Sequence, residues 1–573
     1  MDWTIPNRWL TFVVTLFTAA LLGVTVAQPP PVIPASAPPG LFSAERAMAD
    51  IQAIARDPHP TGSAENARVR AYLVFRLRAL GFSVRETSVP VSNAARERLV
   101  KWTGRSADRA VNIVAVRPGV DAKDELVALM AHYDTVGGSP GAADDSAGVA
   151  AALEIARATG QIPQRRGLAI ILTDAEELGL QGAMGFFAAD PLKRRIGALI
   201  NLETRGGGGR AIMFETGPGN GDMVGLFAAS VRNPSANSLA VRIYDLLPNS
   251  TDFTPAKALG IAGFNFAFID RAYLYHSPMA TPDAIDLRSV QHLGAQALDI
   301  TAALLGVSTL PDRAPDAVFA DVLGRFVIAY PPLVGWPLLA VAGLLLGVAM
   351  RRSAGGWLPV LGGMALAVVF VLLTAGLLWA VNWLSGTSAP ENYYDRLAAL
   401  PRLALQALLL AVAALLLIGA ATGRPQSFRG NWIGLALFNL IVAAGVQMAM
   451  PAAGPLFVWP LLAALAVLAS AGPDRGPPLG FAGVVAVFGL AQLGGFAYFI
   501  ILAIGISAPW TIAVLAPTAL LLLWPLLPPW PPRLPELTAL MLILGAAVVA
   551  MSVRLDPIAL SIPRYSMDHS LRR

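Results

Sequence analysis

The sequence predicts two kinds of structure in one chain. One is an α/β domain with a mixed, mostly parallel sheet sandwiched by helices. The other is an all-α multi-pass membrane domain of about eight helices, accompanied by an N-terminal membrane anchor. Two observations predict this division. Of the 573 residues, 55% are hydrophobic and 14% are charged, which is too apolar for an ordinary soluble protein. The charges are also uneven, because only ten lie between Ser353 and Ser552.

The first apolar stretch runs from Leu10 to Ala27, behind Arg8. At 1.5 Å per residue it is long enough to cross a hydrocarbon core of about 30 Å. We interpret residues 1–28 as a cytoplasmic end and an uncleaved anchor. A removed signal peptide is the alternative, since Thr25-Val-Ala27 resembles a small-residue cleavage site. The proline-rich residues 29–42 favour the anchor, because they predict a stiff spacer that holds the next domain off the membrane.

Residues 43–310 show the alternation of apolar runs and helical patterns that is typical of an α/β domain. The first helix is predicted from a stripe of apolar residues followed by Gly81. The predicted helices cover Ala64 to Leu80, about Asp145 to Ala158, and about Leu287 to Leu305. The predicted strands cover Leu126 to Ala131, Leu168 to Leu172, Ala198 to Leu202, and Ala262 to Ile269.

After a linker at residues 311–332, eight apolar runs within residues 333–552 predict the multi-pass domain, and a tail follows at 553–573. The runs cover about 333–350, 356–384, 403–421, 431–450, 455–471, 479–505, 509–526 and 536–552. The run at 479–505 is long enough to contain a kink or a re-entrant piece.

Orientation follows from the basic loops, because arginine and lysine are enriched in cytoplasmic loops. If the spans alternate, one side of the membrane holds Arg8, Arg351, Arg352, Arg424, Arg429, Arg475 and Arg533. The α/β domain is then predicted on the opposite, non-cytoplasmic face, together with the loop around Asn392-Tyr393-Tyr394.

Composition argues against several classes of function. The net charge of +5 comes without a dense cluster of basic and aromatic residues, so nucleic acid is not an expected partner. The absence of cysteine excludes disulfides, thiolate zinc sites and cysteine nucleophiles. The spans hold almost no ionisable residues away from their ends, which argues against a pump or an intramembrane protease. A platform that positions the exported domain and contacts lipid or a membrane protein partner fits better.

Histidines and carboxylates follow the predicted strands, where the strand ends of an α/β sheet deliver side chains into a cleft. Each has an ordinary explanation, since Asp145 can cap the next helix and paired glutamates commonly begin a solvated helix. Their joint order is more specific than any one of them. The positions are His132, Asp144 with Asp145, Glu176 with Glu177, Glu203, and His276 after Tyr275.

Five such positions suit a cleft that holds two cations. Imidazoles and carboxylates without thiolate favour zinc, with manganese or cobalt as substitutes. A glutamate next to a ligand can reach a metal-activated water without coordinating the metal, and can act as general base. The His132-x-Asp134 spacing lets a carboxylate orient the imidazole.

Six motifs cover residues 43–308 in order: Pro58-His-Pro-Thr-Gly-Ser63, Ala131-His-Tyr-Asp134, Gly141-Ala-Ala-Asp-Asp-Ser146, Ala175-Glu-Glu-Leu-Gly179, Asn201-Leu-Glu203 and Tyr275-His-Ser277. Together they resemble the di-zinc aminopeptidase family of secreted bacterial aminopeptidases and their membrane-bound relatives. The order of one span, an exported domain and eight further spans is similar to the endoplasmic reticulum metallopeptidase and vacuolar membrane protease group, which has bacterial members.

The resemblance implies a zinc-dependent exopeptidase-like fold and a role for each residue. Asp144 would bridge two zinc ions, with His132 and Glu203 completing one site and Glu177 and His276 the other. Glu176 would be the general base, Asp134 would orient His132, Asp145 would shape the turn, and Tyr275 would help to stabilise the oxyanion. One departure is Ala280, four positions past His276, where many relatives carry an acidic residue; Asp283 or Asp286 would have to replace it in space.

The expected function is therefore that of a membrane-anchored zinc peptidase, foremost an aminopeptidase that acts on peptides outside the cytoplasm. Two alternatives remain: a non-catalytic scaffold or receptor on the same fold, and a glutaminyl cyclase or carboxypeptidase-like metalloenzyme. The expected location is a bacterial inner membrane, facing the periplasm, with an endoplasmic reticulum or vacuolar membrane as the alternative. His59, His292 and His569 lack ligand spacing and are expected to be structural.

Overall fold

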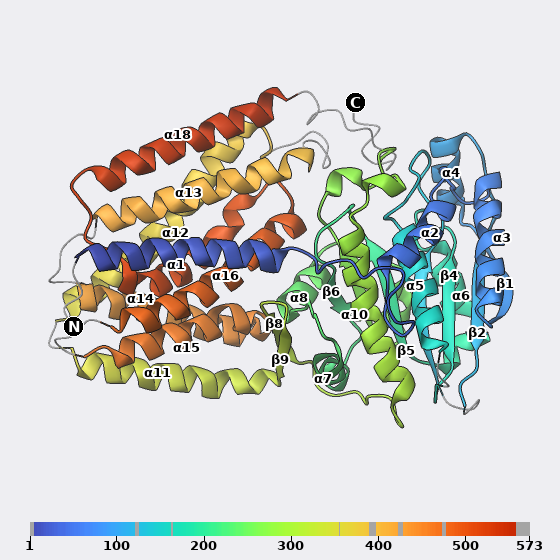
Figure 1. Cartoon of the computed structure of the whole chain (residues 1–573), viewed down its shortest axis with the longest axis horizontal. Helices are drawn as coiled ribbons and strands as arrows, with labels where there is room; N and C mark the ends of the chain where they lie inside the picture. The colour runs from blue at the N-terminus through green and yellow to red at the C-terminus, as the bar shows by residue number, and fades with distance from the viewer. Residues whose placement is uncertain are drawn as a thin grey trace. The chain divides into compact units, whose positions relative to one another are not determined.

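The computed structural model describes residues 5–120, 125–161, 164–353, 356–388, 397–421, 428–472 and 477–556. The chain divides into two compact units. One contains the α/β elements between Gln28 and Pro331, and the other contains the first helix and the helices that follow Pro332 (Figure 1). Several predicted features lie outside the described residues, namely the loop at Asn392–Tyr394, Arg424, Arg475, His569 and most of the tail.

A mixed sheet of seven strands forms the centre of the α/β unit, in the order β1-β2-β4-β3-β5-β7-β6 (Figure 1). Strands β4, β3, β5 and β7 pair in parallel, whereas β1, β2 and β6 run antiparallel to their neighbours. The strands are β1 (Ser83–Pro90), β2 (Arg109–Arg117), β3 (Leu126–His132), β4 (Leu168–Thr173), β5 (Ile196–Thr204), β6 (Ile212–Thr216) and β7 (Ala262–Phe268). The mixed sheet predicted from the sequence is thus confirmed.

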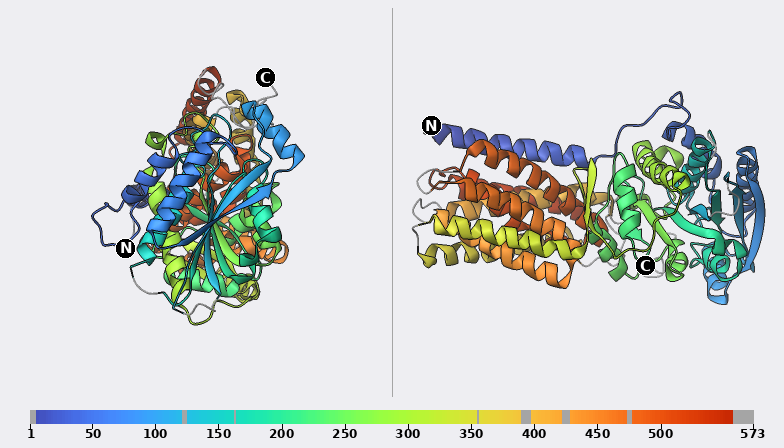
Figure 2. Two further views of the ribbon diagram at one scale, coloured as in Figure 1. Left: turned by 90° about the vertical axis from the view of Figure 1, so that its right-hand side faces the viewer. Right: turned by 90° about the horizontal axis from the view of Figure 1, so that it is seen from below.

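Helices cover both faces of this sheet (Figure 2). One face carries α2 (Ala44–Ile54), α3 (Ala64–Ala79), α5 (Ser146–Thr159), α7 (Gly221–Ser230) and α10 (Leu287–Gly306), and the other carries α6 (Gln181–Ala189) and α9 (Phe253–Ala258). The remaining helices are α4 (Asn93–Thr103), which packs beside β1, and α8 (Ser238–Leu246), which packs beside β6. The three helices predicted from the sequence correspond to α3, α5 and α10.

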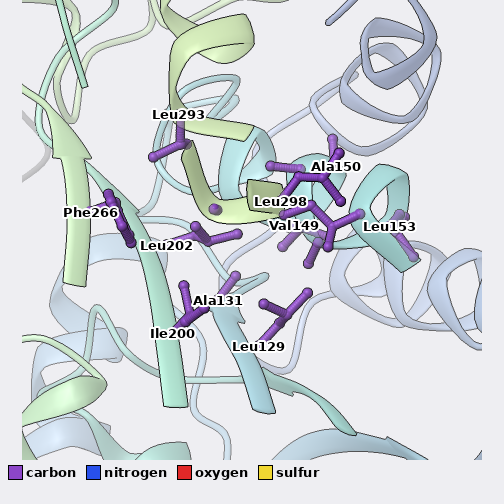
Figure 3. Close-up of a cluster of buried hydrophobic side chains, with 14 of the residues drawn as sticks. Leu129, Ala131, Val149, Ala150, Leu153, Ile200, Leu202, Phe266, Leu293 and Leu298 are labelled. Carbon is purple, nitrogen blue, oxygen red and sulfur yellow. The ribbon is translucent and has the colours of Figure 1, made fainter. Parts of the chain in front are cut away.

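The hydrophobic core between β3, β5, α5 and α10 fixes the positions of the carboxyl ends of the strands. Leu129 of β3 and Ile200 of β5 point toward Leu153 of α5 and Leu298 of α10 (Figure 3). Each of these side chains is nearly or fully buried, and each contributes roughly 1.5–3 kcal/mol by leaving water. Because side chains alternate along a strand, this packing sets which residues stand at the carboxyl ends of the strands.

The segment predicted as a linker contains an antiparallel hairpin, formed by β8 (Val318–Val322) and β9 (Phe326–Tyr330). The first three residues of β8 are buried, whereas no residue of β9 is fully buried. The hairpin ends directly before the first helix of the multi-pass unit.

The chain is a membrane protein: among the described residues, nine helical segments are long and apolar enough to cross a bilayer. The helices are α1 (Ile5–Ala27), α11 (Gly335–Arg351), α12 (Trp357–Ser385), α13 (Leu400–Ala421), α14 (Phe428–Ala449), α15 (Gly454–Ser470), α16 (Leu479–Ile504), α17 (Ala516–Leu523) and α18 (Leu534–Leu555). One span before the α/β unit and eight after it match the predicted number.

The irregular span is not the one that the sequence suggested. Residues 479–505 form the continuous helix α16, whereas residues 509–526 form the short helix α17 between the 3₁₀ segments Pro509–Leu515 and Trp524–Leu526. Prolines 509, 517 and 525 explain this, because proline lacks the N–H that a continuous helix needs.

Small residues allow close packing between the membrane helices. On α1, Thr15 faces Gly483 of α16, and Gly23 faces the backbone of Ala491. On α12 and α14, a Cβ atom added to Gly434 would lie 2.0 Å from the carbonyl oxygen of Val360. Such contacts are typical of packed transmembrane helices. The first helix is thus a packed member of the membrane unit.

Candidate metal centre

The predicted site residues converge at the carboxyl ends of the parallel strands. His132 is the last residue of β3, Glu176 and Glu177 follow β4, and Glu203 is the penultimate residue of β5. Asp144 lies in the turn between β3 and α5, and His276 follows β7. Neighbouring parallel strands end at one edge of a sheet, so residues far apart in the sequence meet there.

The distances define two groups that share Asp144. Its Oδ1 lies 3.1 Å from Nε2 of His132, and its Oδ2 lies 3.1 Å from Nε2 of His276. Oε1 of Glu203 is 3.7 Å from His132 Nε2, and Oε1 of Glu177 is 3.0 Å from His276 Nε2. Ligand atoms of a tetrahedral zinc ion, at bonds of about 2.0–2.1 Å, lie about 3.3 Å apart. The spacing therefore fits two cations that share one carboxylate.

A third group with ligand spacing contains His132, Glu176 and Glu177. Its donor atoms lie within 4.8 Å of one another, as they do in the two groups that share Asp144. The carboxylate of Glu176 therefore stands beside both metal groups. The position of this carboxylate is compatible with either of two roles, that of a metal ligand or that of a general base.

The chemistry of these donors fits a metal. Nδ1 of His132 lies 3.0 Å from the backbone carbonyl oxygen of Asp134. A proton on Nδ1 donates to that oxygen, so the lone pair on Nε2 faces Asp144. The carboxylate of Asp144 also has only lone pairs to offer, and no described residue donates a hydrogen bond to Oε1 of Glu177. Lone pairs that face one another across a buried space are what a cation satisfies.

Electrostatics point the same way. The side chains of His132, Asp144, Glu177 and His276 are only 1–9% exposed. Burial raises the pKa of Glu177 to about 7, against the opposing effect of His276, and burial also raises the pKa of Glu176 well above its usual value. Burial by itself would lower the pKa of His132, but the surrounding carboxylates raise it overall. The centre thus carries more negative charge than its side chains balance, and divalent cations would balance it.

Two aspartates support the centre in different ways. Asp145 caps α5 by accepting the backbone N–H of Gly148 at 3.1 Å, so the capping explanation applies to Asp145 and leaves Asp144 to the histidines. Asp134 accepts the backbone N–H groups of Glu176 at 3.0 Å and Glu177 at 3.3 Å. Its carboxylate is 3.6 Å from Nδ1 of His132. The closer backbone carbonyl therefore orients the imidazole, and the carboxylate holds the glutamate loop.

The loop around His276 shows how the departure at position 280 is accommodated. Ala280 is 5% exposed, and its carbonyl oxygen accepts the backbone N–H of Ala142 at 3.0 Å. Asp286 caps α10 by accepting the N–H of Arg288, so it is engaged there and does not replace an acid at 280. The half-buried ring of Tyr275 stacks on His276, with 3.7 Å between ring centroids.

Sequence reasoning missed two buried acids. Asp174 accepts hydrogen bonds from the Thr61 hydroxyl at 2.9 Å and from the N–H of Val111 at 2.9 Å. It ties the Pro58–Ser63 motif to the end of β4, and its place beside Glu176 could have revealed it. Asp252 is 1% exposed and accepts the hydroxyl of Thr173. It lies in an ordinary polar stretch, so no pattern marks it.

The other histidines within the described ranges are structural. Nδ1 of His59 lies 2.9 Å from the carbonyl oxygen of Asp57. Nδ1 of His292 accepts the backbone N–H of Ala211 at 3.1 Å, and burial lowers the pKa of His292 to about 3. Neither ring belongs to a group with ligand spacing among the described residues.

Comparison with known proteins agrees with this geometry. Residues 112–301 match Peptidase family M28, and this stretch contains all six residues of the three groups with ligand spacing. This segment belongs to peptidase family M28.

Curated relatives are similar to this chain over a longer stretch. Endoplasmic reticulum metallopeptidase 1 of Mus musculus is 32% identical over 313 residues, which is 52% of this chain and 35% of the mouse protein. Vacuolar membrane protease of Candida dubliniensis is 31% identical over 285 residues, 48% of this chain and 30% of that protein. The matches span about a third of the length of these relatives. Among solved structures, an aminopeptidase from Aneurinibacillus sp. strain AM-1 aligns with a TM-score of 0.36 and 16% identity, covering 48% of this chain and 97% of that chain.

Proposed function

We propose that the chain is a membrane-anchored, zinc-dependent peptidase, and specifically an aminopeptidase that releases N-terminal residues from peptides. The observation that carries the proposal is Asp144, whose two carboxylate oxygens each lie 3.1 Å from a different buried imidazole. In this proposal two zinc ions, or manganese or cobalt in their place, are held by His132, Asp144, Glu177, Glu203 and His276. Membership of family M28 supports the reaction class.

When bound, the two ions supply a water of lowered pKa and polarise the scissile carbonyl. Glu176 takes the proton of the attacking water and passes it to the leaving nitrogen. Its backbone is held in place by Asp134, and burial raises its pKa, which suits a group that first accepts a proton and then gives it up. Tyr275, stacked on His276, donates to the developing oxyanion.

The first test is the metal content and the product of the detergent-purified protein. Elemental mass spectrometry is expected to find about two zinc ions per chain. Mass spectrometry of a peptide panel is expected to show free N-terminal residues. A pyroglutamate product would instead identify a glutaminyl cyclase, and a free C-terminal residue would identify a carboxypeptidase. A protein that takes up no zinc and cleaves no peptide would be a scaffold.

The role of Glu176 is tested by Glu176→Gln. The variant is expected to keep both zinc ions and to lose most of kcat, because the amide cannot accept the proton. Loss of zinc together with activity would instead make Glu176 a metal ligand. Glu97→Gln is a matched control, since Glu97 lies exposed on α4.

We also propose that the α/β unit lies on the non-cytoplasmic side of a bacterial inner membrane and faces the periplasm. The support is the set of arginines at one end of the spans, of which Arg352 and Arg429 donate to backbone carbonyls of neighbouring helix ends. The chain has no cysteine, so single cysteines report topology cleanly. A membrane-impermeant maleimide is expected to label Glu97→Cys in spheroplasts and to leave Ser353→Cys unlabelled until the membrane is opened. The reverse pattern would invert the orientation.

The expected partners are peptides at the metal centre and lipid around the spans, with a membrane protein as a further partner of the multi-pass unit. Some of the polar groups buried between its helices pair with one another within the unit, whereas others, such as Gln406 Oε1, have no hydrogen-bond partner among the described residues. In one such pair, the hydroxyl of Thr518 donates to Asn439 Oδ1 at 2.9 Å. A platform that holds the peptidase at the membrane surface is the role that this packing supports.

A further inference from the structure

A cavity of about 350 Å³ is lined by none of the residues of the proposed metal centre and takes no part in the reaction described above. We name it the loop cavity, because it is formed by three loops, Pro58–Ser63, Trp102–Ser106 and Gly137–Gly138. The first of these is a motif that contains no proposed metal ligand. The volume is in the range of sites that hold small molecules.

The loops that line the cavity lie at the same edge of the sheet as the metal centre. Strand β2 runs antiparallel to β4, so the Trp102–Ser106 loop, which precedes β2, stands where β4 ends. Thr61 donates to Asp174, two residues before Glu176. Gly137 follows Asp134 by three residues, so their Cα atoms are at most about 11 Å apart. An extended tripeptide has about the same length.

The three loops are held tightly against one another. A Cβ atom on Gly62 would lie 2.6 Å from Cβ of Ala107, and the φ of Gly62 is +76°. A Cβ atom on Gly137 would lie 3.1 Å from the side chain of Thr103 and 3.2 Å from the backbone oxygen of Trp102. The wall of the cavity therefore requires glycine at position 62 and is closely packed at position 137.

Its lining carries one charge. Arg105 is exposed at the cavity, and no described residue forms an ion pair with its guanidinium group. No carboxylate is among the lining residues, and the rest of the lining consists of serine, threonine, glycine, proline and tryptophan. A guanidinium group presents a planar fork of donors that matches a carboxylate. An anionic group of this shape is therefore the ligand that suits the cavity.

We infer that the loop cavity binds the carboxylate of a short peptide through Arg105, while the first residue of the same peptide lies at the metal centre. This inference rests on the proposed peptidase function and adds a substrate class to it. Two parts of a peptide can supply this carboxylate: the C-terminus of a peptide of about three residues, or an acidic side chain near the third position. Arg105 is then a specificity-determining residue and takes no part in the chemical step.

The test compares three peptides with the full-length, zinc-loaded protein in detergent: Ala-Ala-Ala with a free C-terminus, its C-terminal amide, and Ala-Ala-Asp amide. The ratio of kcat/KM for each carboxylate peptide to that for the plain amide is the readout. In the wild type we expect at least one ratio of about ten or more, which corresponds to about 1.4 kcal/mol. In Arg105→Gln we expect this ratio to approach one, with a partial effect in Arg105→Lys. The peptide with the high ratio identifies the source of the carboxylate.

Arg78→Gln is the matched control, since Arg78 is an exposed arginine on α3 away from the cavity, and it is expected to keep the wild-type ratio. Ratios near one for both carboxylate peptides in the wild type, or a ratio that survives Arg105→Gln, would overturn the inference. Calorimetric binding of the same peptides to Glu176→Gln separates the two proposals. Arg105-dependent carboxylate binding without cleavage by the wild type would refute the peptidase alone, and cleavage without such binding would refute the loop cavity alone.

Discussion

Replacing Asp134 by asparagine separates two roles that this carboxylate can have. The side chain is 1% exposed, and its two oxygens accept the N–H groups of Glu176 and Glu177 at 3.0 and 3.3 Å. Asparagine keeps one acceptor and turns an NH₂ group toward the second N–H. Hydrogen bonds to a charged group contribute about 1.5–3 kcal/mol, against about 0.5–1.5 kcal/mol for neutral ones. The glutamate loop should therefore lose roughly 2–4 kcal/mol, while the backbone carbonyl continues to orient His132.

If this cost falls on metal binding, the affinity of the group with Glu177 drops by roughly thirty-fold to a thousand-fold, at about 1.4 kcal/mol per factor of ten. The assay is a zinc titration of purified Asp134→Asn against a chromophoric chelator, with the exposed Asp222→Asn as control. One ion should remain tightly bound and one should weaken. The retained ion is assigned by adding Glu203→Ala, which should remove it. Weakening of the ion held with Glu203, in place of the ion held with Glu177, would refute the reasoning, since it would mean that the carboxylate acts mainly through the His132 ring.

Three further perturbations test other parts of the structure. Asp144→Ala should reduce the zinc content from about two ions per chain to none, as measured by elemental mass spectrometry. One fully occupied site would contradict the sharing of Asp144. The control Asp145→Ala should lose the cap of α5, which costs about 0.5–2 kcal/mol of stability, and should keep the metal. A strong chelator should lower the Tm of the wild type and added zinc should restore it, because a ligand that binds the folded state stabilises it; a constant Tm would argue against metal in the native fold. Gly434→Ala should destabilise the membrane unit by about 1–3 kcal/mol, since its Cβ would lie 2.0 Å from the carbonyl oxygen of Val360. Gly445→Ala on the same helix should not destabilise the unit, because open space surrounds that position. Thermal unfolding in detergent compares the two variants, and equal Tm values would contradict the close packing.

The sequence predicts the parts of the fold that are buried on both sides. Strands β3, β4, β5 and β7 read as continuous apolar runs, because parallel strands in the middle of a covered sheet expose neither face, and their predicted bounds agree with the structure within two residues. Strand β1 has only one buried residue among its eight, so its hydrophobic pattern is weak. Strands β2 and β6 also pair antiparallel outside the parallel core, and none of the three was predicted.

The site follows the same logic. Residues at the ends of predicted strands, such as His132 and Glu203, can be recognised because the strand before each of them is recognisable. The hydrogen bonds from the backbone of Glu176 and Glu177 to the Asp134 carboxylate cannot be recognised in this way. They depend on the loop after β4, where Ala175 has a φ of +62° and turns the chain back toward β3. Asp252 reaches Thr173 across 79 positions. Contacts of this kind depend on loop conformation, which residue periodicity does not encode.

The topology explains why these ligands gather where they do. From β3 the chain passes through α5 to β4 on one side, and later returns through α6 to β5 on the other side of β3. Helix α5 covers one face of the sheet and α6 covers the opposite face. The connections thus diverge at the carboxyl end of β3, which is the crevice where open α/β sheets bind their ligands. His132 ends β3 at this point, with Glu177 supplied from β4 and Glu203 from β5. A one-residue shift of β3 against either neighbour would turn His132 to the opposite face of the sheet, so the core packing of Leu129 and Ile200 is also what sets the geometry of the metal ligands.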